Sequence, residues 1–463
     1  MPDFCLRDIL IASEAEAAGS LQSTGAAFAY RDLLTGTCLA GARKELHGKS
    51  VLIAPKSQLA SATALIELDG IASRLVICPP DFTPFLLSSV IKQAEVDAVV
   101  YDGGSVDDGS GLPHYFCGQP APADADRQSF AGKTEWVLPT SGTTGPPKLV
   151  AHTLTHLLGA IQKPPAREPR VSWATFYDIR RFGGMQIFLR AVSGSHTLVI
   201  SEPDEPQVDF LRRCQAAGVT HMSGTPSHWR RLLMSPHANL LSLRYIRLSG
   251  EIADRAILES LRATYPEARI VHAFASTEAG VAFEVTDEQE GFPASFINEN
   301  DQENDQVGLR VEDGSLRVRS RRTALRYIGR GDLKLHDEDG FVDTDDLIEL
   351  QNNRYYFKGR RAGVINIGGL KVHPEEVESV INLHPRVSMS LVRARRNPIM
   401  GNIITAYVVL DGKLQPIQAD AVLKSEILAV CGERLERHKI PAVIDFVASL
   451  DVLGSGKLAR NHA

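Results

Sequence analysis

The residue types best suited to chemistry lie in one short segment, PTSGTTGPPKLV at 139–150, directly after the apolar run WVL. Glycines let a backbone approach a polyphosphate closely, while hydroxyls, amide hydrogens and one lysine can donate hydrogen bonds to its oxygens. The predicted phosphate-binding residues are Thr140, Ser141, Gly142, Thr143, Thr144, Gly145 and Lys148. A P-loop NTPase would need GxxxxGK followed by Ser or Thr, and this spacing differs. The later GSGKL at 454–458 also fails, because Leu458 occupies the hydroxyl position.

A second motif, FASTE at 274–278, ends a predicted strand, where ligands of parallel sheets bind. With the phosphate loop it resembles the acyl-adenylate-forming superfamily, which includes acyl-CoA synthetases, carrier-protein adenylation domains and luciferases. SGTTGxPK is highly specific to that superfamily. The resemblance implies that Phe274 packs on adenine, Thr277 contacts the α-phosphate and Glu278 holds Mg²⁺. Ala275 replaces the usual glycine.

The third and fourth motifs are VDTDDL at 342–347 and a run that begins GRRAG at Gly359. The superfamily usually has Thr-Gly-Asp at the third motif, so Asp345 replaces a glycine. The resemblance assigns Asp346 to the ribose, since a carboxylate can accept both hydroxyls. It also implies that Arg360 helps to hold the nucleotide. Ala362 stands where the superfamily has a hinge Asp or Lys.

The last motif, SGKLAR at 455–460, resembles the C-terminal catalytic lysine motif and points to Lys457. Adenylation brings a carboxylate against a polyphosphate, and a positioned cation can stabilise the transition state in which their charges meet. The resemblance therefore implies that Lys457 acts in adenylation, together with Thr277 and Glu278.

The acid-binding residues are less clearly marked. The segment FYDIRRFGGMQIF at 176–188 places Arg180 or Arg181 near a position where related enzymes often have histidine. A buried arginine could pair with a second carboxylate of the substrate, and the alternative is two exposed arginines on a turn. Further predicted lining residues are Met222, Thr225, Ser249 and Gly250.

The elements that must position these residues follow an alternating pattern of short β-branched runs and helical segments, which is typical of parallel sheets covered by helices. Predicted strands are 51–54, 74–78, 97–101, 197–201, 244–250 and 269–274. Helical spacing predicts helices over 207–218, which ends at Gly218, and 253–266. From about 285 to 320, alternating polar and apolar residues predict a smaller antiparallel β subdomain. The fold class is α/β with a small α+β C-terminal lid.

We expect two domains, a large one over 1–358 and a lid over 359–463, which the superfamily rotates between two half-reactions. Residues 359–463 carry 14 Lys and Arg against 10 Asp and Glu, a net charge of +4 in a chain whose formal net charge is −6. This positive lid favours the phosphates of coenzyme A or an acidic carrier protein, although ordinary surface variation also accounts for it.

Composition excludes several classes of protein. The 463 residues are 43% hydrophobic and 23% charged, which is typical of globular domains rather than disordered or fibrous chains. The negative net charge argues against a nucleic acid partner. Six scattered cysteines without a CxxC pair favour free thiols over zinc or disulfides. Neither a targeting segment nor 18 consecutive apolar residues occur, which favours the cytoplasm.

The combined expectation is an acid:thiol ligase of the acyl-CoA synthetase type. Its cofactors would be ATP, Mg²⁺ and CoA, or the phosphopantetheine of a carrier protein. One rival is a stand-alone adenylation enzyme that loads an acyl carrier protein. Another is a nucleotide-binding regulator without catalysis, supported by Ala275, Asp345 and Ala362 and opposed by Glu278 and Lys457. A third, a P-loop NTPase, would release ADP and phosphate.

Overall fold

The computed structural model of the chain describes residues 4–12, 19–103, 110–122, 132–140, 147–162, 171–202, 204–297, 307–331, 333–367, 369–397, 401–411, 420–454 and 456–460. The chain divides into two compact units, each assembled from three stretches. Unit 1 comprises Met1–Ser223, Ala275–Ala282 and Arg319–Val342. Unit 2 comprises Gly224–Phe274, Phe283–Val318 and Asp343–Ala463. Five strands, β13, β15, β16, β19 and β21, continue along the chain from one unit into the other.

Unit 1 contains mainly parallel strands. One sheet has the order β20-β10-β9-β5-β4-β6-β7, in which β10 is antiparallel to both neighbours and the strands from β9 to β7 are parallel. The strands are β1 (Ser20–Gln22), β2 (Ala27–Ala29), β3 (Gly36–Thr37), β4 (Ser50–Ile53), β5 (Arg74–Ile77), β6 (Ala98–Tyr101), β7 (His114–Phe116), β8 (Ala121–Pro122), β9 (Glu135–Pro139), β10 (Leu149–Thr153), β11 (Ser172–Thr175), β12 (Thr197–Ile200), β13 (His221–Gly224) and β20 (Arg326–Ile328). A second run of strands has the order β13-β11-β12-β1-β2, parallel except for β2.

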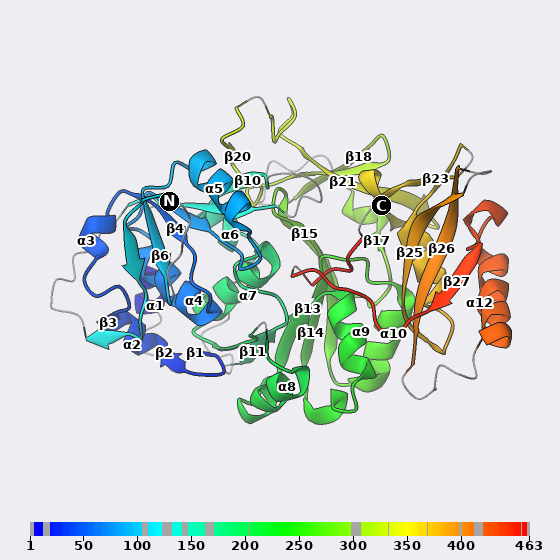
Figure 1. The fold of residues 1–463 in the computed structure, drawn as a ribbon, viewed down its shortest axis with the longest axis horizontal. Coiled ribbons are helices and arrows are strands. Elements are labelled where there is room, and N and C mark those ends of the chain that lie inside the picture. Colours follow the sequence, from blue (N-terminus) through cyan, green and yellow to red (C-terminus); the bar gives the residue numbers. More distant parts are fainter. Residues whose placement is uncertain are drawn as a thin grey trace. The chain divides into compact units, whose positions relative to one another are not determined.

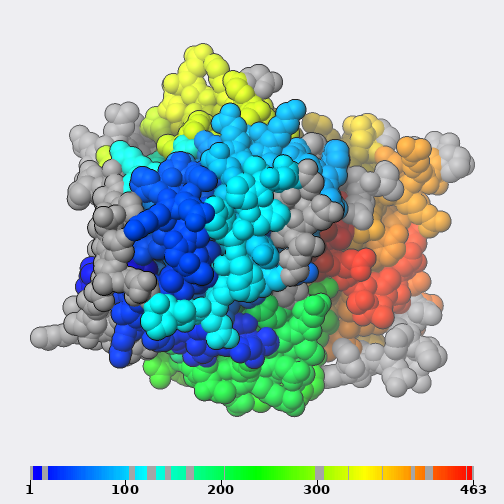
Figure 2. Space-filling view, turned by 60° about the vertical axis from the view of Figure 1, so that its left-hand side comes forward, coloured from blue at the N-terminus to red at the C-terminus, as the bar shows by residue number. Residues whose placement is uncertain are grey.

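The helices of unit 1 are α1 (Leu6–Ala12), α2 (Tyr30–Thr35), α3 (Arg43–Leu46), α4 (Gln58–Leu68), α5 (Pro84–Gln93), α6 (Leu154–Leu158), α7 (Phe182–Ser193) and α8 (Gln207–Ala216). Local chemistry explains where they begin. The Ser57 hydroxyl accepts hydrogen bonds from the first amides of α4, and Thr83 does the same before Pro84 opens α5. In the space-filling view, the blue N-terminal segments adjoin the cyan segments that follow residue 100, in agreement with the pairing of β3 and β8 (Figure 2).

Unit 2 contains the antiparallel β subdomain and the C-terminal elements. One sheet has the order β17-β22-β21-β19-β18, and another has the order β25-β26-β27. The strands are β14 (Tyr245–Ser249), β15 (Arg269–Ser276), β16 (Gly280–Val285), β17 (Phe292–Pro293), β18 (Gly308–Glu312), β19 (Ser315–Arg319), β21 (Val342–Gln351), β22 (Arg354–Arg360), β23 (Ile365–Ile367), β24 (Leu370–Val372), β25 (Val387–Asn397), β26 (Gly401–Leu410) and β27 (Val443–Phe446). The helices are α9 (Pro226–Met234), α10 (Arg255–Thr264), α11 (Pro374–Ile381) and α12 (Asp420–Arg434), and α12 lies alongside the β25–β27 sheet (Figure 1).

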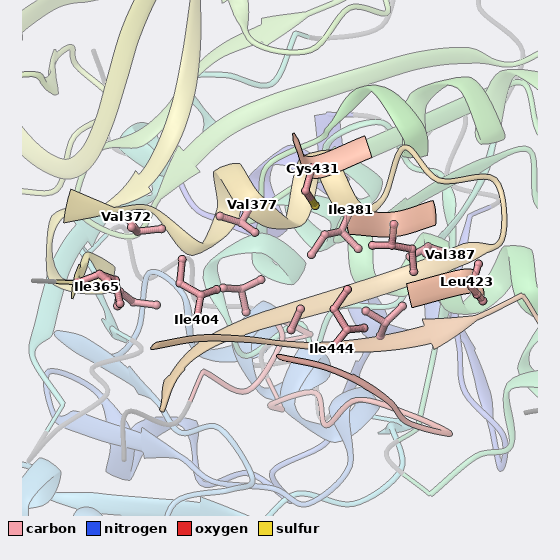
Figure 3. Packing of buried hydrophobic residues seen from close by; sticks show 14 residues of the cluster. Ile365, Val372, Val377, Ile381, Val387, Ile404, Leu423, Cys431 and Ile444 are labelled. Atoms are coloured by element: carbon pink, nitrogen blue, oxygen red, sulfur yellow. The ribbon is translucent and has the colours of Figure 1, made fainter. Parts of the chain in front are cut away.

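The C-terminal part of unit 2 has its own hydrophobic core, which lies between α11, α12 and the β25–β27 sheet. Figure 3 shows Val377 and Ile381 of α11 pointing toward Ile404 and Ile444 on the strands. All fourteen buried members lie between Ile365 and Ile444, which supports a lid that packs by itself. The exact boundary at 358/359 stays a prediction. Gly359 and Arg360 are the last residues of β22, rather than part of an irregular junction.

The fold class is confirmed as α/β with parallel sheets and a C-terminal α+β part, and all six predicted strands and both helices are present. Gly218 has a φ of +61°, as its place at a helix end requires. All six cysteines are free thiols, and burial raises the pKa of Cys78 to about 12. Across the described residues, no helix is both long enough and apolar enough to cross a membrane.

Candidate nucleotide and acid-activation site

The phosphate loop connects β9 to β10. These strands are antiparallel with Pro139 opposite Leu149, and the Thr140 amide donates to the Lys148 carbonyl over 2.8 Å, which closes the base of the loop. The Lys148 ammonium lies 5.4 Å from the centre of the Tyr327 ring. Ser141, Gly142, Thr143, Thr144 and Gly145 lie outside the described residues. Their phosphate-binding role stays a prediction, as do those of Thr140 and Lys148.

Thr277 and Glu278 form the tight turn between β15 and β16, at the carboxyl end of β15 as predicted. The Ser276 hydroxyl accepts the Ala279 amide at 2.9 Å, and the Glu278 carbonyl accepts the Ala324 amide at 2.9 Å. The Ser276 hydroxyl and the main-chain groups of the turn therefore hold it in place.

A buried histidine that the sequence analysis missed supports this turn. His152 on β10 is fully buried, and its Nε2 lies 2.8 Å from the Thr277 carbonyl, so Nε2 must carry the proton and donate. Burial lowers the pKa of His152 to about 4, which keeps the ring neutral at ordinary pH. His152 is one of several buried residues on this strand, so its place in the sequence did not indicate a role.

Glu278 fits the predicted Mg²⁺ role by the chemistry of its oxygens. Its carboxylate forms no hydrogen bond or ion pair with a described residue, and Mg²⁺ sites commonly combine one or two carboxylates with phosphate oxygens and water. Within the described residues, no group of three or more His, Cys, Asp or Glu side chains could hold a metal. A metal here would therefore depend on the phosphates of a bound nucleotide.

In unit 2, Asp346 and Arg360 face each other across β21 and β22. They are register partners, with 3.5 Å between Nε and a carboxylate oxygen. Burial raises the pKa of Asp346, while the charges of Arg360 and Lys457 oppose that rise. Lys457 thus lies within electrostatic reach of the carboxylate. Asp346 and Arg360, predicted from separate motifs, therefore form an ion pair in this unit.

Asp345 occupies a glycine-like backbone conformation. Its φ is +59°, the left-handed region that glycine adopts most easily, and Asp is one of the few other residues that tolerate it. Its amide donates to the Asp343 carboxylate at 2.9 Å, which holds the turn. The departure from Thr-Gly-Asp therefore preserves the backbone geometry.

Phe274 is the first member of an aromatic cluster. Its ring is nearly parallel to those of Phe357, with centroids 5.1 Å apart, and Phe283, with centroids 5.5 Å apart. Phe292 contacts both of these partners. The predicted adenine contact stays a prediction, and the stack shows that the orientation of Phe274 is fixed by neighbouring rings. Phe357 is far from Phe274 in sequence, so spacing alone could not identify this partner.

The Lys457 segment lies against residues predicted to line the acid pocket. The Thr225 hydroxyl donates to the Gly456 carbonyl at 2.6 Å. A β-carbon at Gly250, whose φ is +86°, would lie 3.4 Å from Cε of Lys457. Thr225 also caps α9, where Pro226 is the first residue. Thr225 and Gly250 thus contact the Lys457 segment, and both the catalytic role of Lys457 and the contact of these two residues with an acid remain predictions.

Ser249 and Met222 lie on strands of different units. Ser249 is the last residue of β14 and pairs with Ala273. Met222 on β13 is fully buried opposite Ala174 of β11. No described contact distinguishes either residue as an acid-pocket residue.

Arg180 and Arg181 each have a carboxylate partner of their own. Arg180 is 0% exposed, which contradicts the alternative of an exposed turn: Nε and one terminal nitrogen bind Asp178 at 2.8 and 2.6 Å, and the other terminal nitrogen donates to the carbonyls of Pro55 and Lys56. Arg181 binds both oxygens of Asp81, which is 52% exposed. These contacts favour structural roles over binding of a substrate carboxylate.

Known proteins resemble the chain over most of its length. The 2-succinylbenzoate–CoA ligase of Staphylococcus aureus (strain JH9) is 24% identical over 335 residues, which are 70% of this chain and 65% of that ligase. The matched part thus spans just under two thirds of that relative. Among solved structures, an anthranilate CoA ligase in complex with anthranoyl-AMP has a TM-score of 0.79 at 16% identity, covering 99% of this chain and 96% of its own. The o-succinylbenzoate CoA synthetase of Bacillus subtilis in complex with its acyl-adenylate has a TM-score of 0.71 at 18% identity, covering 99% and 97%.

These structural likenesses establish the fold. The AMP-binding enzyme C-terminal domain matches residues 376–457, within the predicted lid. The AMP-binding enzyme family matches residues 69–327, which is more than half of the chain and includes the phosphate loop and the Thr277–Glu278 turn. The chain therefore belongs to the AMP-binding enzyme family.

Proposed function

We propose that the protein is an ATP-dependent carboxylic acid:thiol ligase that forms an acyl-adenylate and transfers the acyl group to coenzyme A. The observation that carries the proposal is the Asp346–Arg360 ion pair in unit 2, the same unit in which the Lys457 segment contacts Thr225 and Gly250. A carboxylate able to accept ribose hydroxyls stands there beside a cation able to neutralise phosphate. The relatives support CoA as the acceptor, because those named above are CoA ligases.

In the first half-reaction, a carboxylate oxygen attacks the α-phosphorus of ATP. The bond from that phosphorus to the bridging oxygen breaks, and pyrophosphate leaves with the electron pair. One repulsive pair of charges at 4 Å costs about 4 kcal/mol at an effective dielectric of 20. Lys457 would offset this repulsion where charge concentrates, and Asp346 would orient the ribose. Bound through Glu278, Mg²⁺ would supply further neutralisation of the phosphates.

In the second half-reaction, the thiol sulfur attacks the acyl carbon, AMP leaves, and the thiol proton passes to solvent. At that stage no carboxylate is brought against a polyphosphate, so the repulsion that Lys457 would offset in the first half-reaction does not arise. The acceptor could also be the phosphopantetheine of a carrier protein, and thioester formation with free CoA against a panel of holo carrier proteins separates the two. We place the reaction in the cytoplasm as part of the proposal.

The test is acid-dependent exchange of labelled pyrophosphate into ATP, over a panel of aliphatic, aryl and dicarboxylic acids that includes anthranilate and 2-succinylbenzoate. We expect exchange with at least one acid and AMP as the nucleotide product. Lys457→Ala is the matched control: it should lose roughly 10²- to 10³-fold in exchange yet still convert a prepared acyl-adenylate to thioester. ADP as product, or no exchange with any acid, would refute the proposed function.

A further inference from the structure

Glu251 joins two chain segments that are far apart in sequence. One carboxylate oxygen accepts the Ser227 amide at 2.9 Å, and the other accepts the Leu458 amide at 2.9 Å. Ser227 is the second residue of α9, and Leu458 directly follows Lys457. Hydrogen bonds from amides to a carboxylate are stronger than those to a neutral acceptor. Glu251 therefore fixes the backbone beside the lysine to the start of a helix.

Gly456, the residue before the lysine, packs closely against His228 of α9. Gly456 has a φ of +78°, and a β-carbon there would overlap the ring of His228. Its carbonyl accepts the Thr225 hydroxyl at 2.6 Å. The backbone on both sides of Lys457 is thus held by α9 and by Glu251. The ammonium group itself is not needed for any of these contacts.

A second contact holds the segment that follows Lys457. Arg460 forms a bidentate pair with the buried carboxylate of Glu378 on α11, with distances of 2.8 and 2.5 Å. The two contacts are separate, because Glu251 holds Leu458 while Glu378 holds Arg460. Removal of Glu251 would leave the Arg460 pair in place, as well as the hydrogen bond from the Leu453 amide to the Lys457 carbonyl, and would free the Leu458 amide from its acceptor.

We propose that Glu251 is a positioning residue for Lys457: by binding the Leu458 amide, its carboxylate sets where the lysine ammonium stands during adenylation. This inference rests on the proposed function, since it assigns Lys457 to that half-reaction. Glu251 acts through the backbone of its neighbour. Its loss should slow acid activation and spare acyl transfer to the thiol, in which Lys457 takes no part.

The contact itself can be tested without activity, by hydrogen exchange of the 453–460 segment. Glu251→Ala should speed exchange of the Leu458 amide about tenfold or more, because its acceptor is gone. Glu259→Ala is the matched control: among the described residues, this exposed glutamate on α10 pairs with the exposed Arg255, and its loss should leave that exchange unchanged. Unchanged exchange in Glu251→Ala would overturn the proposal whatever the protein catalyses.

The consequence is tested by measuring the two half-reactions separately. Glu251→Ala should lower pyrophosphate exchange roughly 10- to 100-fold, the scale of one hydrogen bond to a charged group, with thioester formation from prepared acyl-adenylate retained. Glu251→Gln keeps one carbonyl acceptor and should lose less. Equal loss of both half-reactions would show that the α9 contact serves folding, and it would refute the positioning of Lys457 by Glu251. Pyrophosphate exchange at the normal rate would also refute it. If the unaltered protein exchanges no pyrophosphate, the proposed function fails and this inference fails with it, whatever the variants do.

Discussion

Replacement of the buried Arg180 by alanine should cost stability rather than substrate recognition. The guanidinium is 0% exposed, and its partners are the Asp178 carboxylate and the carbonyls of Pro55 and Lys56. Arg180→Ala leaves that carboxylate, whose side chain is 10% exposed, without its counter-charge. Removal of one partner from a buried ion pair typically costs about 3–5 kcal/mol. That is a large part of a stability of roughly 5–15 kcal/mol.

The assay is urea unfolding followed by circular dichroism, with Arg181→Ala as the matched control. Arg181 pairs with an aspartate that is 52% exposed, so its loss should cost about 1 kcal/mol or less. The double variant Asp178→Ala/Arg180→Ala should lose less than the sum of the single changes, because no unpaired carboxylate remains.

An alternative outcome would refute this reasoning. If Arg180→Ala changed the free energy of unfolding by less than about 1 kcal/mol and reduced kcat/KM only for acids with a second carboxylate, Arg180 would be a substrate-binding residue. A structural arginine instead predicts a lower urea midpoint and, at low temperature, a similar kcat/KM pattern across the acid panel.

Three further changes test other parts of the structure. Asp345→Gly should change the free energy of unfolding by less than about 1 kcal/mol, whereas Asp345→Val should lower it by roughly 1–2 kcal/mol because its φ is +59°; equal urea midpoints would contradict this. His152 has a folded pKa of about 4 against the ordinary 6.5, so the unfolded chain binds its proton first and stability falls as pH drops from 6.5 to 4, on the order of 3 kcal/mol in all. In His152→Gln the urea midpoint should depend less on pH over that window. An unchanged pH dependence would show that the His152 ring does not cause the loss of stability. Asp346→Ala should raise the KM for ATP about tenfold or more, with a smaller change in kcat, and an unchanged KM would remove Asp346 from the ribose site.

Much of the fold could be predicted because it depends on local patterns. Buried strands such as β4 and β5 are short runs rich in β-branched residues, and α10 begins where Asp254 accepts the Ile257 amide and ends before Pro266. The role of Gly359 could not be predicted from local patterns. Its φ is +120°, and a β-carbon there would overlap the Glu375 carboxylate on α11, so the glycine permits close packing at a strand end.

The sequence motifs predict the residues of the site, and they do not predict the residues that support them. Motif spacing identifies Asp346, Arg360 and Lys457 because each follows a recognisable run. His152 and Glu251 contact backbone atoms of distant segments, and the sequence does not show which backbone group a side chain will contact. The same limit applies to Arg180, whose burial depends on carbonyls more than a hundred residues away.

The interleaving of the two units has a consequence for synthesis of the chain. Unit 1 begins at the N-terminus, but its last stretch, Arg319–Val342, follows two stretches of unit 2. That stretch contains β20, which pairs with β10 at the edge of the seven-stranded sheet. At about 5–20 residues per second, a ribosome would need roughly 6–24 seconds to pass from the end of the first stretch to residue 342. During that interval the edge of β10 would be without its partner strand, so the nascent chain is most exposed to aggregation midway through translation.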